Sequence, residues 1–317
     1  MTNITLNDRA SEVVARIIAD RHALRVDVKN AESGARVIDL GIDSPGGLEA
    51  GIRLSEACMS GLGRVELSTA VGALGGGPAV VVRTDHPVAA CMASQYAGWQ
   101  IALDDYFAMG SGPIRAAAGT EELFESIGFR EKPTAVVGIL ETSKRPNVAV
   151  VEYIAERCGV EPQNVTLLIA PTASQAGTVQ IVARIVETAL HKMHEQGFDL
   201  SRVESGWGSA PLPAVAANDM EGIGRTNDAI LYGGRAVLWV RGDDDSLEEF
   251  GPRIPSCASA DFGRPFLEIF EAYDRDFYKI DPHLFSPALV TLCNLDTGRT
   301  FHFGQLHPDV LQHSLSE

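Results

Sequence analysis

The sequence predicts an α/β fold, because short β-branched runs of strand length alternate along the chain with segments whose apolar residues recur at helical spacing. The chain has 317 residues, which at ~100–200 residues per domain is enough for a two-domain subunit. Hydrophobic residues make up 45% of it and charged residues 21%, as in ordinary compact proteins. A disordered chain, a fibrous repeat and a disulfide-held miniprotein are therefore excluded.

Four elements are expected in the first half of the chain. Ala10–Ala23 has the apolar periodicity of a helix, and Pro78–Thr84 is a β-branched run after a glycine cluster, which predicts a buried strand. Thr134–Glu141 is a second strand-like run. Val150–Cys158 follows it with helical periodicity, so strand and helix alternate here.

The second half continues the alternation. Asn164–Ala170 is an apolar strand, and Thr178–Glu195 is expected to be one long helix. The run Asp228–Val240 (DAILYGGRAVLWV) is rich in apolar and β-branched residues and predicts a further strand.

The expected domain limit lies near residue 130. The stretch FREKP (Phe129–Pro133) interrupts the regular pattern, so we expect an N-terminal α/β domain over 1–130 and a C-terminal α/β domain over 131–317, either of which can be discontinuous. The sequence contains no internal repeat and no low-complexity tract.

Charge and cysteine usage narrow the function. Forty-two acidic residues against 26 Lys and Arg give a net charge of −16, which repels phosphate backbones and anionic membranes, so nucleic acid and membrane are not expected partners. The N-terminus has no secretory pattern, and no run reaches the ~18 apolar residues of a membrane span. The five cysteines are scattered without a CxxC pair, as in reduced packing residues, and we expect a cytoplasmic protein.

Three glycine clusters could bind phosphate: LGGGP (Leu74–Pro78), MGSGP (Met109–Pro113) and YGGR (Tyr232–Arg235). None matches GxGxxG or GxxxxGK[ST], so a Rossmann fingerprint and a P-loop are excluded, and each cluster is interpreted first as a tight turn. The second cluster is the best candidate for a phosphate-binding loop, because its small residues let a ligand approach the backbone and the arginine that follows could hold an anion. Its residues are Gly110, Ser111, Gly112 and Arg115.

The histidines do not predict a metal site. His191 and His194 are three apart on the expected helix, and His302 and His307 are five apart near the C-terminus. No HExxH motif and no Cys/His cluster accompanies them. Solvated or packed histidines are the better interpretation.

The segment Asn164–Glu195 carries the most information. Its strand runs into PTASQAGT (Pro171–Thr178), which places the hydroxyls of Thr172 and Ser174 and a helix N-terminus at the carboxyl end of a strand. Ligands commonly bind at that position in α/β proteins. The segment is therefore a candidate binding site.

At about 100° per residue, Gln180, Arg184, Glu187 and His191 form a polar stripe on the expected helix. One interpretation is a solvent-exposed face with an ordinary ion pair. The other is a carboxylate held beside a guanidinium in an apolar cleft, where it could orient and deprotonate a water molecule. Sequence spacing leaves both open.

Four separate blocks resemble one family, the methenyltetrahydromethanopterin cyclohydrolases, and the similarity extends over essentially the whole chain. The blocks are Asp105–Ala116, Ala170–Glu187, Gly224–Arg235 and Asp276–Ala288. The resemblance implies a cytoplasmic, metal-free enzyme of one-carbon metabolism in methanogens and methylotrophs, which in methylotrophs serves formaldehyde oxidation. It also implies a homotrimer of two-domain subunits with the pterin in the cleft between domains. Such enzymes hydrolyse a cationic methenyl bridge to the formyl derivative, and the tetrahydromethanopterin derivative is substrate carrier rather than cofactor.

The resemblance also implies residue roles. Glu187 matches the catalytic glutamate, which takes a proton from the attacking water, and Arg184 matches its partner arginine. Glu141, at a strand end, resembles an acidic position assigned to the pterin ring or the cation. Archaeal members have a lysine where this chain has Tyr96, which points to a different pterin tail. The predicted substrate-binding set is Glu141, Tyr96, Gly110, Ser111, Gly112, Arg115, Thr172, Ser174 and Gln180.

Two alternatives remain at this stage. One is a non-catalytic pterin- or nucleotide-binding protein in which Arg184 and Glu187 are structural. The other is the same hydrolysis carried out on methenyltetrahydrofolate.

Overall fold

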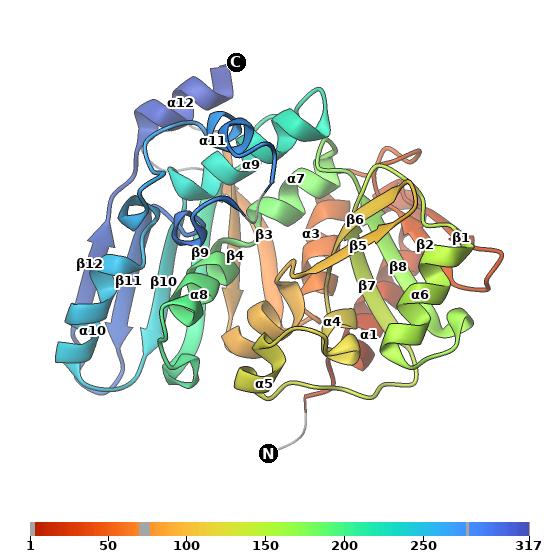
Figure 1. Ribbon diagram of the computed structural model, residues 1–317, viewed down its shortest axis with the longest axis horizontal. Coiled ribbons are helices and arrows are strands. Elements are labelled where there is room, and N and C mark those ends of the chain that lie inside the picture. The colour runs from red at the N-terminus through yellow and green to blue at the C-terminus, as the bar shows by residue number, and fades with distance from the viewer. Residues whose placement is uncertain (1–3, 70–76, 277–278, 317) are drawn as a thin grey trace. The chain divides into compact units, whose positions relative to one another are not determined.

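The computed structural model describes residues 4–69, 77–276 and 279–316 (Figure 1). The chain forms two compact units, one made of Met1–Gly63 and Ala89–Gln180 and the other of Arg64–Val88 and Ile181–Glu317. Each unit contains one mixed six-stranded sheet, which confirms the α/β class.

The sheet of the first unit has the order β1-β2-β8-β7-β6-β5. Strands β2, β8 and β7 are parallel, and the other pairs are antiparallel. The bounds are β1 Asp27–Asn30, β2 Arg36–Asp39, β5 Trp99–Leu103, β6 Tyr106–Ser111, β7 Val136–Glu141 and β8 Val165–Ala170. The helical elements are α1 Leu6–Ala19, α2 Arg21–Leu24, α3 Leu48–Cys58, a π-helix Val88–Gln95 labelled η1, α4 Ile114–Ala118, α5 Leu123–Ile127, α6 Val148–Cys158, the 3₁₀ turn η2 Pro162–Asn164 and α7 Gln175–Val182.

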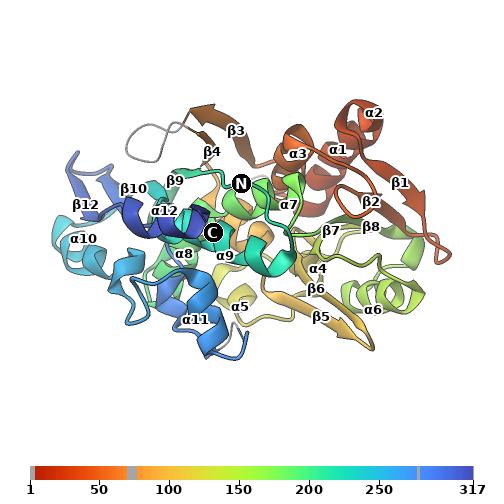
Figure 2. The same ribbon diagram turned by 90° about the horizontal axis from the view of Figure 1, so that it is seen from above.

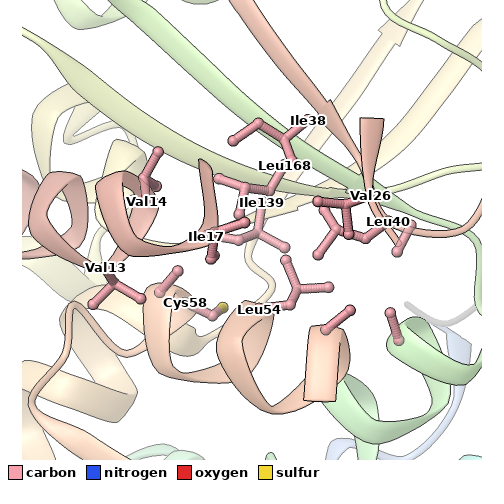
Figure 3. Packing of buried hydrophobic residues seen from close by; sticks show 14 of the residues in the cluster. Val13, Val14, Ile17, Val26, Ile38, Leu40, Leu54, Cys58, Ile139 and Leu168 are labelled. Carbon is pink, nitrogen blue, oxygen red and sulfur yellow. The ribbon is translucent and has the colours of Figure 1, made fainter. Parts of the chain in front are cut away.

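Helices cover both faces of this sheet because both faces are apolar. Alternate residues of a strand point to opposite faces, so Ile139 of β7 and Leu168 of β8 pack on α1 and α3, while Leu140 and Leu167 pack on the side of α4 and α6. Figure 2 shows these helix pairs on opposite sides of β7 and β8. In Figure 3 the side chains of α1 and α3 meet those of the sheet around Ile139.

The sheet of the second unit has the order β12-β11-β10-β9-β4-β3. The bounds are β3 Gly63–Thr69, β4 Pro78–Thr84, β9 Val203–Pro211, β10 Arg235–Val240, β11 Leu289–Asn294 and β12 Thr300–Gly304. The helices are α8 Ile185–Glu195, α9 Asp219–Leu231, α10 Asp244–Phe250, α11 Phe266–Ala272 and α12 Pro308–Ser316, with 3₁₀ turns at Leu200–Arg202, Gly251–Arg253, Ser256–Ala258 and Pro282–Leu284. Helix α8 packs on β9, β10 and β4 (Figure 1).

Most sequence predictions are confirmed. Pro78–Thr84 is β4, and the runs expected to end at Glu141 and Ala170 are β7 and β8. The expected helix Val150–Cys158 is α6 with two further residues at its start. The expected helix Ala10–Ala23 is divided at Asp20 into α1 and α2.

Two element predictions were wrong. The first part of Asp228–Val240 is the end of α9, because its apolar residues continue the helical period that starts at Asp219, and only Arg235–Val240 is a strand. The expected helix Thr178–Glu195 is interrupted between α7 and α8 at residues 183–184.

The compact units also differ from the halves 1–130 and 131–317. Strands β7 and β8 follow residue 130, yet they pair with β6 and β2 in the first sheet. Strand β4 precedes residue 130 but pairs with β9 in the second sheet. Each unit follows its sheet rather than the order of the chain.

Candidate active site

The N-terminus of α8 carries a buried ion pair. Arg184 is the N-cap residue of this helix, and Glu187 lies in its first turn. The Arg184 Nη1 and Glu187 Oε2 atoms are 3.9 Å apart, and the side chains are only 8% and 5% exposed. A helix N-terminus favours a negative charge, so the peptide dipoles of α8 and the guanidinium act in the same direction on the carboxylate.

Two glycines of β9 allow α8 to approach the sheet closely. A Cβ atom at Gly206 would lie 2.6 Å from a Val186 methyl, and one at Gly208 would lie 2.8 Å from a methyl of Ile185. Ile185 and Val186 are fully buried. Because they fix the helix against the sheet, Arg184 and Glu187 point away from β9 on the other side of the helix.

The interruption before α8 changes the predicted stripe. The Arg184 N–H donates to the carbonyl of Ile181, and the Thr188 N–H donates to the carbonyl of Arg184. Gln180 therefore belongs to α7, and the prediction that Gln180 to His191 form one continuous polar stripe on a single helix was wrong. His191 lies 3.7 Å from Glu195, a separate pair farther along α8.

Helix α8 is anchored at its far end by Lys192. Its ammonium is fully buried and donates to the backbone carbonyls of Pro255 and His283. Burial lowers the pKa of Lys192 to about 8.

In the first unit, Glu141 ends β7 and is joined to the loop that follows the neighbouring strand. The Thr172 hydroxyl donates to Glu141 Oε1. Glu141 is paired in register with Met109 of β6, one residue before Gly110. The structure therefore brings Glu141 and Thr172 together at the carboxyl ends of the parallel strands β7 and β8. Strand β6 is antiparallel, so its glycine turn lies beside Ile139 rather than at that edge.

Ser174 has a local structural role. Its hydroxyl donates to the Pro171 carbonyl at 2.7 Å and accepts from the Gly177 N–H at 3.0 Å, which caps the start of α7. Its predicted contact with substrate stays a prediction.

The turn Gly110–Gly112 is held by packing that requires its glycines. A Cβ at Gly110 would lie 3.0 Å from the Trp99 carbonyl oxygen, and Gly112 has φ = +87°. Between them, the Ser111 hydroxyl lies 3.4 Å from the Cys58 thiol. Gln180 Nε2 donates to the same sulfur at 3.8 Å, so Cys58 connects two predicted binding residues.

Arg115 is occupied within its own unit. Its guanidinium makes two hydrogen bonds to Glu121, one of them 2.8 Å long, and Nη1 donates to the Met92 carbonyl at 3.0 Å. The Tyr96 ring lies over it, 4.8 Å from Cζ to the ring centroid. This arrangement favours a structural role over the expected capture of an anion.

Sequence reasoning missed two members of these networks. Cys58 was interpreted as a packing residue, and Glu121 was not singled out at all. A short-range signal existed for Glu121, which lies six residues after Arg115 with a glycine between them. Nothing in the local pattern marks Cys58, because its partners come from residues 95, 111 and 180.

The other predicted features are ordinary. His302 Nδ1 is 3.0 Å from the Thr291 hydroxyl, and His307 packs edge-on against Phe262. Within residues 4–69, 77–276 and 279–316, no three His, Cys, Asp or Glu side chains gather in a way that could hold a metal ion.

All five cysteines are free thiols, although Cys257 is exposed and so is not a packing residue. In the same part of the chain, no helix has the length and apolar character to span a membrane. Leu74–Gly76 of the first glycine cluster lie outside the described residues.

Comparison with known proteins agrees with the resemblance. The family described as Cyclohydrolase (MCH) matches residues 5–315. A methenyltetrahydromethanopterin cyclohydrolase of Xanthobacter autotrophicus is 46% identical, with 98% of this chain and 92% of the relative covered. The proteins of the same name from Methylobacillus flagellatus and Methanosarcina mazei are 45% and 43% identical, with 98% of this chain covered in both cases and 95% and 98% of the relatives. The chain belongs to the methenyltetrahydromethanopterin cyclohydrolase family.

Proposed function

We propose that this chain hydrolyses the methenyl bridge of methenyltetrahydromethanopterin to give the formyl derivative. The observation that carries the proposal is the buried pair of Arg184 and Glu187 at the start of α8, in a chain whose family match spans residues 5–315. An ordinary surface ion pair would be solvated, whereas the two side chains of this pair are almost fully buried, as ionisable groups at functional sites often are.

The substrate carbon is already electrophilic, because it lies between two nitrogens that share one positive charge. Hydrolysis adds water to this carbon and breaks one of its C–N bonds, with one proton released overall. Glu187 takes a proton from the attacking water as the C–O bond forms, and it returns that proton to the departing ring nitrogen. The proton of the new hydroxyl is lost as the formyl C=O forms.

Arg184 keeps Glu187 ionised and orients it. A guanidinium 3.9 Å away stabilises the carboxylate over the acid, so Glu187 is ready to act as a base. The charged planar group of Arg184 can also hold the water by a hydrogen bond.

The predicted binding residues serve the same substrate in this proposal. Glu141 contacts the pterin ring or the cation with its carboxylate positioned by Thr172. Gln180, four residues before Arg184 in the chain, is a second predicted substrate contact. We retain the expectation that the pterin binds in a cleft between domains. There it would contact the predicted binding residues as well as Arg184 and Glu187.

The reaction as proposed needs no metal ion, because a dication beside a cationic carbon would repel it. The test is prolonged chelation followed by elemental analysis and assay. Unchanged activity is expected. Loss of activity that returns with added zinc or magnesium would show that the proposed chemistry of one glutamate and one arginine is wrong.

The proposal as a whole is tested by the loss of methenyl absorbance with purified protein. Three carriers are compared: the archaeal methenyltetrahydromethanopterin, the form with a shortened tail, and methenyltetrahydrofolate. Turnover of the tetrahydromethanopterin forms is expected, with the shortened tail preferred because of Tyr96. Binding without turnover would instead indicate a pterin-binding protein, and turnover of the folate derivative alone would indicate a folate enzyme.

We also propose that the enzyme is a cytoplasmic homotrimer, as the resemblance implies. Light scattering on the purified protein is then expected to give three times the chain mass of 33.9 kDa. A monomeric mass at assay concentration would refute the trimer.

A further inference from the structure

The π-helix η1 (Val88–Gln95) ends immediately before Tyr96, and groups from outside it cap its last carbonyls. The Met92 carbonyl accepts from Arg115 Nη1 at 3.0 Å, and the Ser94 carbonyl accepts from the Gly112 N–H at 2.8 Å. The Tyr96 N–H closes the final turn by donating to the Cys91 carbonyl. π-Helices are rare and often mark functional sites, so this capped end requires an explanation.

Arg115 is the central group of this cap. Its guanidinium is 1% exposed, and its charge is balanced by the two hydrogen bonds to Glu121. A buried charge requires such a partner. With Nε and Nη2 held by Glu121 and Nη1 held by η1, the guanidinium has one orientation, and the Tyr96 and Phe124 rings lie over it at 4.8 and 5.2 Å.

Gly98 leaves the space that this arrangement needs. A Cβ atom at this position would lie 2.2 Å from Glu121 Oε2 and 2.6 Å from Tyr96 Cε1. The carboxylate and the ring therefore approach the same point of the backbone, and a Cβ there would force one of them to move.

We propose that Arg115 and Glu121 are positioning residues that set the orientation of the Tyr96 ring for the pterin. This inference rests on the proposed function, since it takes Tyr96 as a substrate contact. Tyr96 is half-buried, so its ring packs on the guanidinium and still retains accessible surface. A lysine at this position would instead bring an ammonium beside the guanidinium, and the two like charges would repel.

The test is a double-mutant cycle between Tyr96→Leu and Glu121→Gln, with KM and kcat measured for each protein. Glu121→Gln is expected to raise KM roughly 10-fold while kcat stays within about threefold, because binding is disturbed and the chemistry is not. In the Tyr96→Leu background the same change is expected to leave KM unaltered. Tyr96→Phe keeps the ring over the guanidinium, so it is expected to couple to Glu121→Gln as the wild-type residue does.

The matched control is Glu131→Gln. Glu131 is also a structural carboxylate of the first unit, where it accepts from the N–H groups of Leu6 and Asn7 at the start of α1. This variant is expected to lower the thermal midpoint and leave KM unchanged. If Glu121→Gln does not fold, Gly98→Ala replaces it in the cycle. Gly77→Ala is then the control, because no residue that the structure describes lies within 4 Å of a Cβ there.

Three outcomes would overturn the inference. A KM increase of equal size in both backgrounds would show that Glu121 does not act through Tyr96, and an unchanged KM would show that it positions nothing. Binding of tetrahydromethanopterin to the wild-type protein is measured by quenching of its intrinsic fluorescence. If the protein binds this carrier but does not hydrolyse the methenyl form, the proposed function fails, and the same cycle is then measured with Kd in place of KM. A wild-type protein that neither binds nor turns over the carrier refutes both.

Discussion

The side chains of Arg184 and Glu187 are buried although the sequence around them is that of an amphipathic surface helix. Periodicity identified the polar side of the helix and the family resemblance identified the pair. Neither could tell whether that side faces solvent, because burial depends on residues distant in the chain. For the same reason the partners of Arg115 were not foreseen, and its place in a glycine-rich turn suggested an anion site.

Replacing Glu187 by Gln keeps the shape of the side chain and removes the base. Hydrolysis is expected to fall by roughly 10²–10⁴, while the substrate still binds. Methenyl absorbance measures the rate, and fluorescence quenching measures binding. Activity within a few-fold of the wild type would rule out a general base at this position.

Arg184→Lys keeps the positive charge but loses the planar fork that can hold both a carboxylate and a water. The variant is expected to be slower than the wild type and to have a shifted pH–rate profile, because an ammonium at that distance stabilises the Glu187 carboxylate differently. The profile of kcat between pH 5 and 9 measures this. An unchanged rate and profile would mean that charge alone is sufficient.

At the scale of elements, local patterns located only four strands, β4, β7, β8 and β10, and could not separate a strand from a buried helix end. Ala229, Ile230 and Leu231 are fully buried at the end of α9, so their apolar run resembled the strand that follows. The pair Gly233–Gly234 marks the true change, since a Cβ at Gly234 would lie 2.5 Å from the Ile230 carbonyl oxygen. The interruption before α8 has no signal of this kind, because neither glycine nor proline occupies residues 183–184.

Gly208→Ala tests how the closeness of α8 to β9 affects the proposed catalytic pair, Arg184 and Glu187. The added methyl would lie 2.8 Å from a methyl of Ile185, which is too close, so the helix or the strand must shift. A displaced pair is expected to lower kcat by roughly 10-fold or more, with a smaller effect on binding. Gly77→Ala, whose added methyl lies within 4 Å of no described residue, is the control and should leave both constants unchanged. Equal kcat in the two variants would contradict the prediction.

Asp228 joins three helices of the second unit. Its Oδ1 accepts from the Phe266 N–H at the start of α11, and its Oδ2 accepts from the Ser314 hydroxyl of α12. Burial raises the pKa of Asp228 to about 7, and the charge of Glu268 acts in the same direction. The folded protein therefore holds a proton at pH values where the unfolded chain, with an ordinary Asp pKa near 4, has already lost it.

It follows that the contribution of Asp228 to the free energy of unfolding should decrease by up to about 4 kcal/mol as the pH rises from about 4 to about 7 and then level off. Asp228→Asn does not titrate, so its stability relative to the wild type is expected to rise over the same window. Chemical denaturation at pH 5, 6, 7 and 8 measures the difference. A constant difference across these pH values would contradict the assignment.

At the scale of the whole molecule, the sequence predicted the fold class, while the two compact units do not coincide with the halves 1–130 and 131–317. The breaks in composition that suggested a limit near residue 130 are local, whereas membership of a unit is decided by which strands pair. Strand β8 lies between β2 and β7, and β4 lies beside β9, so both units combine distant parts of the chain.

This interleaving has a consequence for biosynthesis on the ribosome. Strand β2 is synthesised early, but its partner β8 is complete only at residue 170. The apolar strand β4 likewise has no β9 to pair with until the chain reaches Pro211. Until then β4 has an unpaired, aggregation-prone edge. We therefore expect a nascent chain stopped at residue 130 to be protease-sensitive and to bind a holdase chaperone, whereas one extended through residue 211 should resist limited proteolysis over its first 63 residues. A protected fragment 1–130 would show that the first unit folds without its central strands.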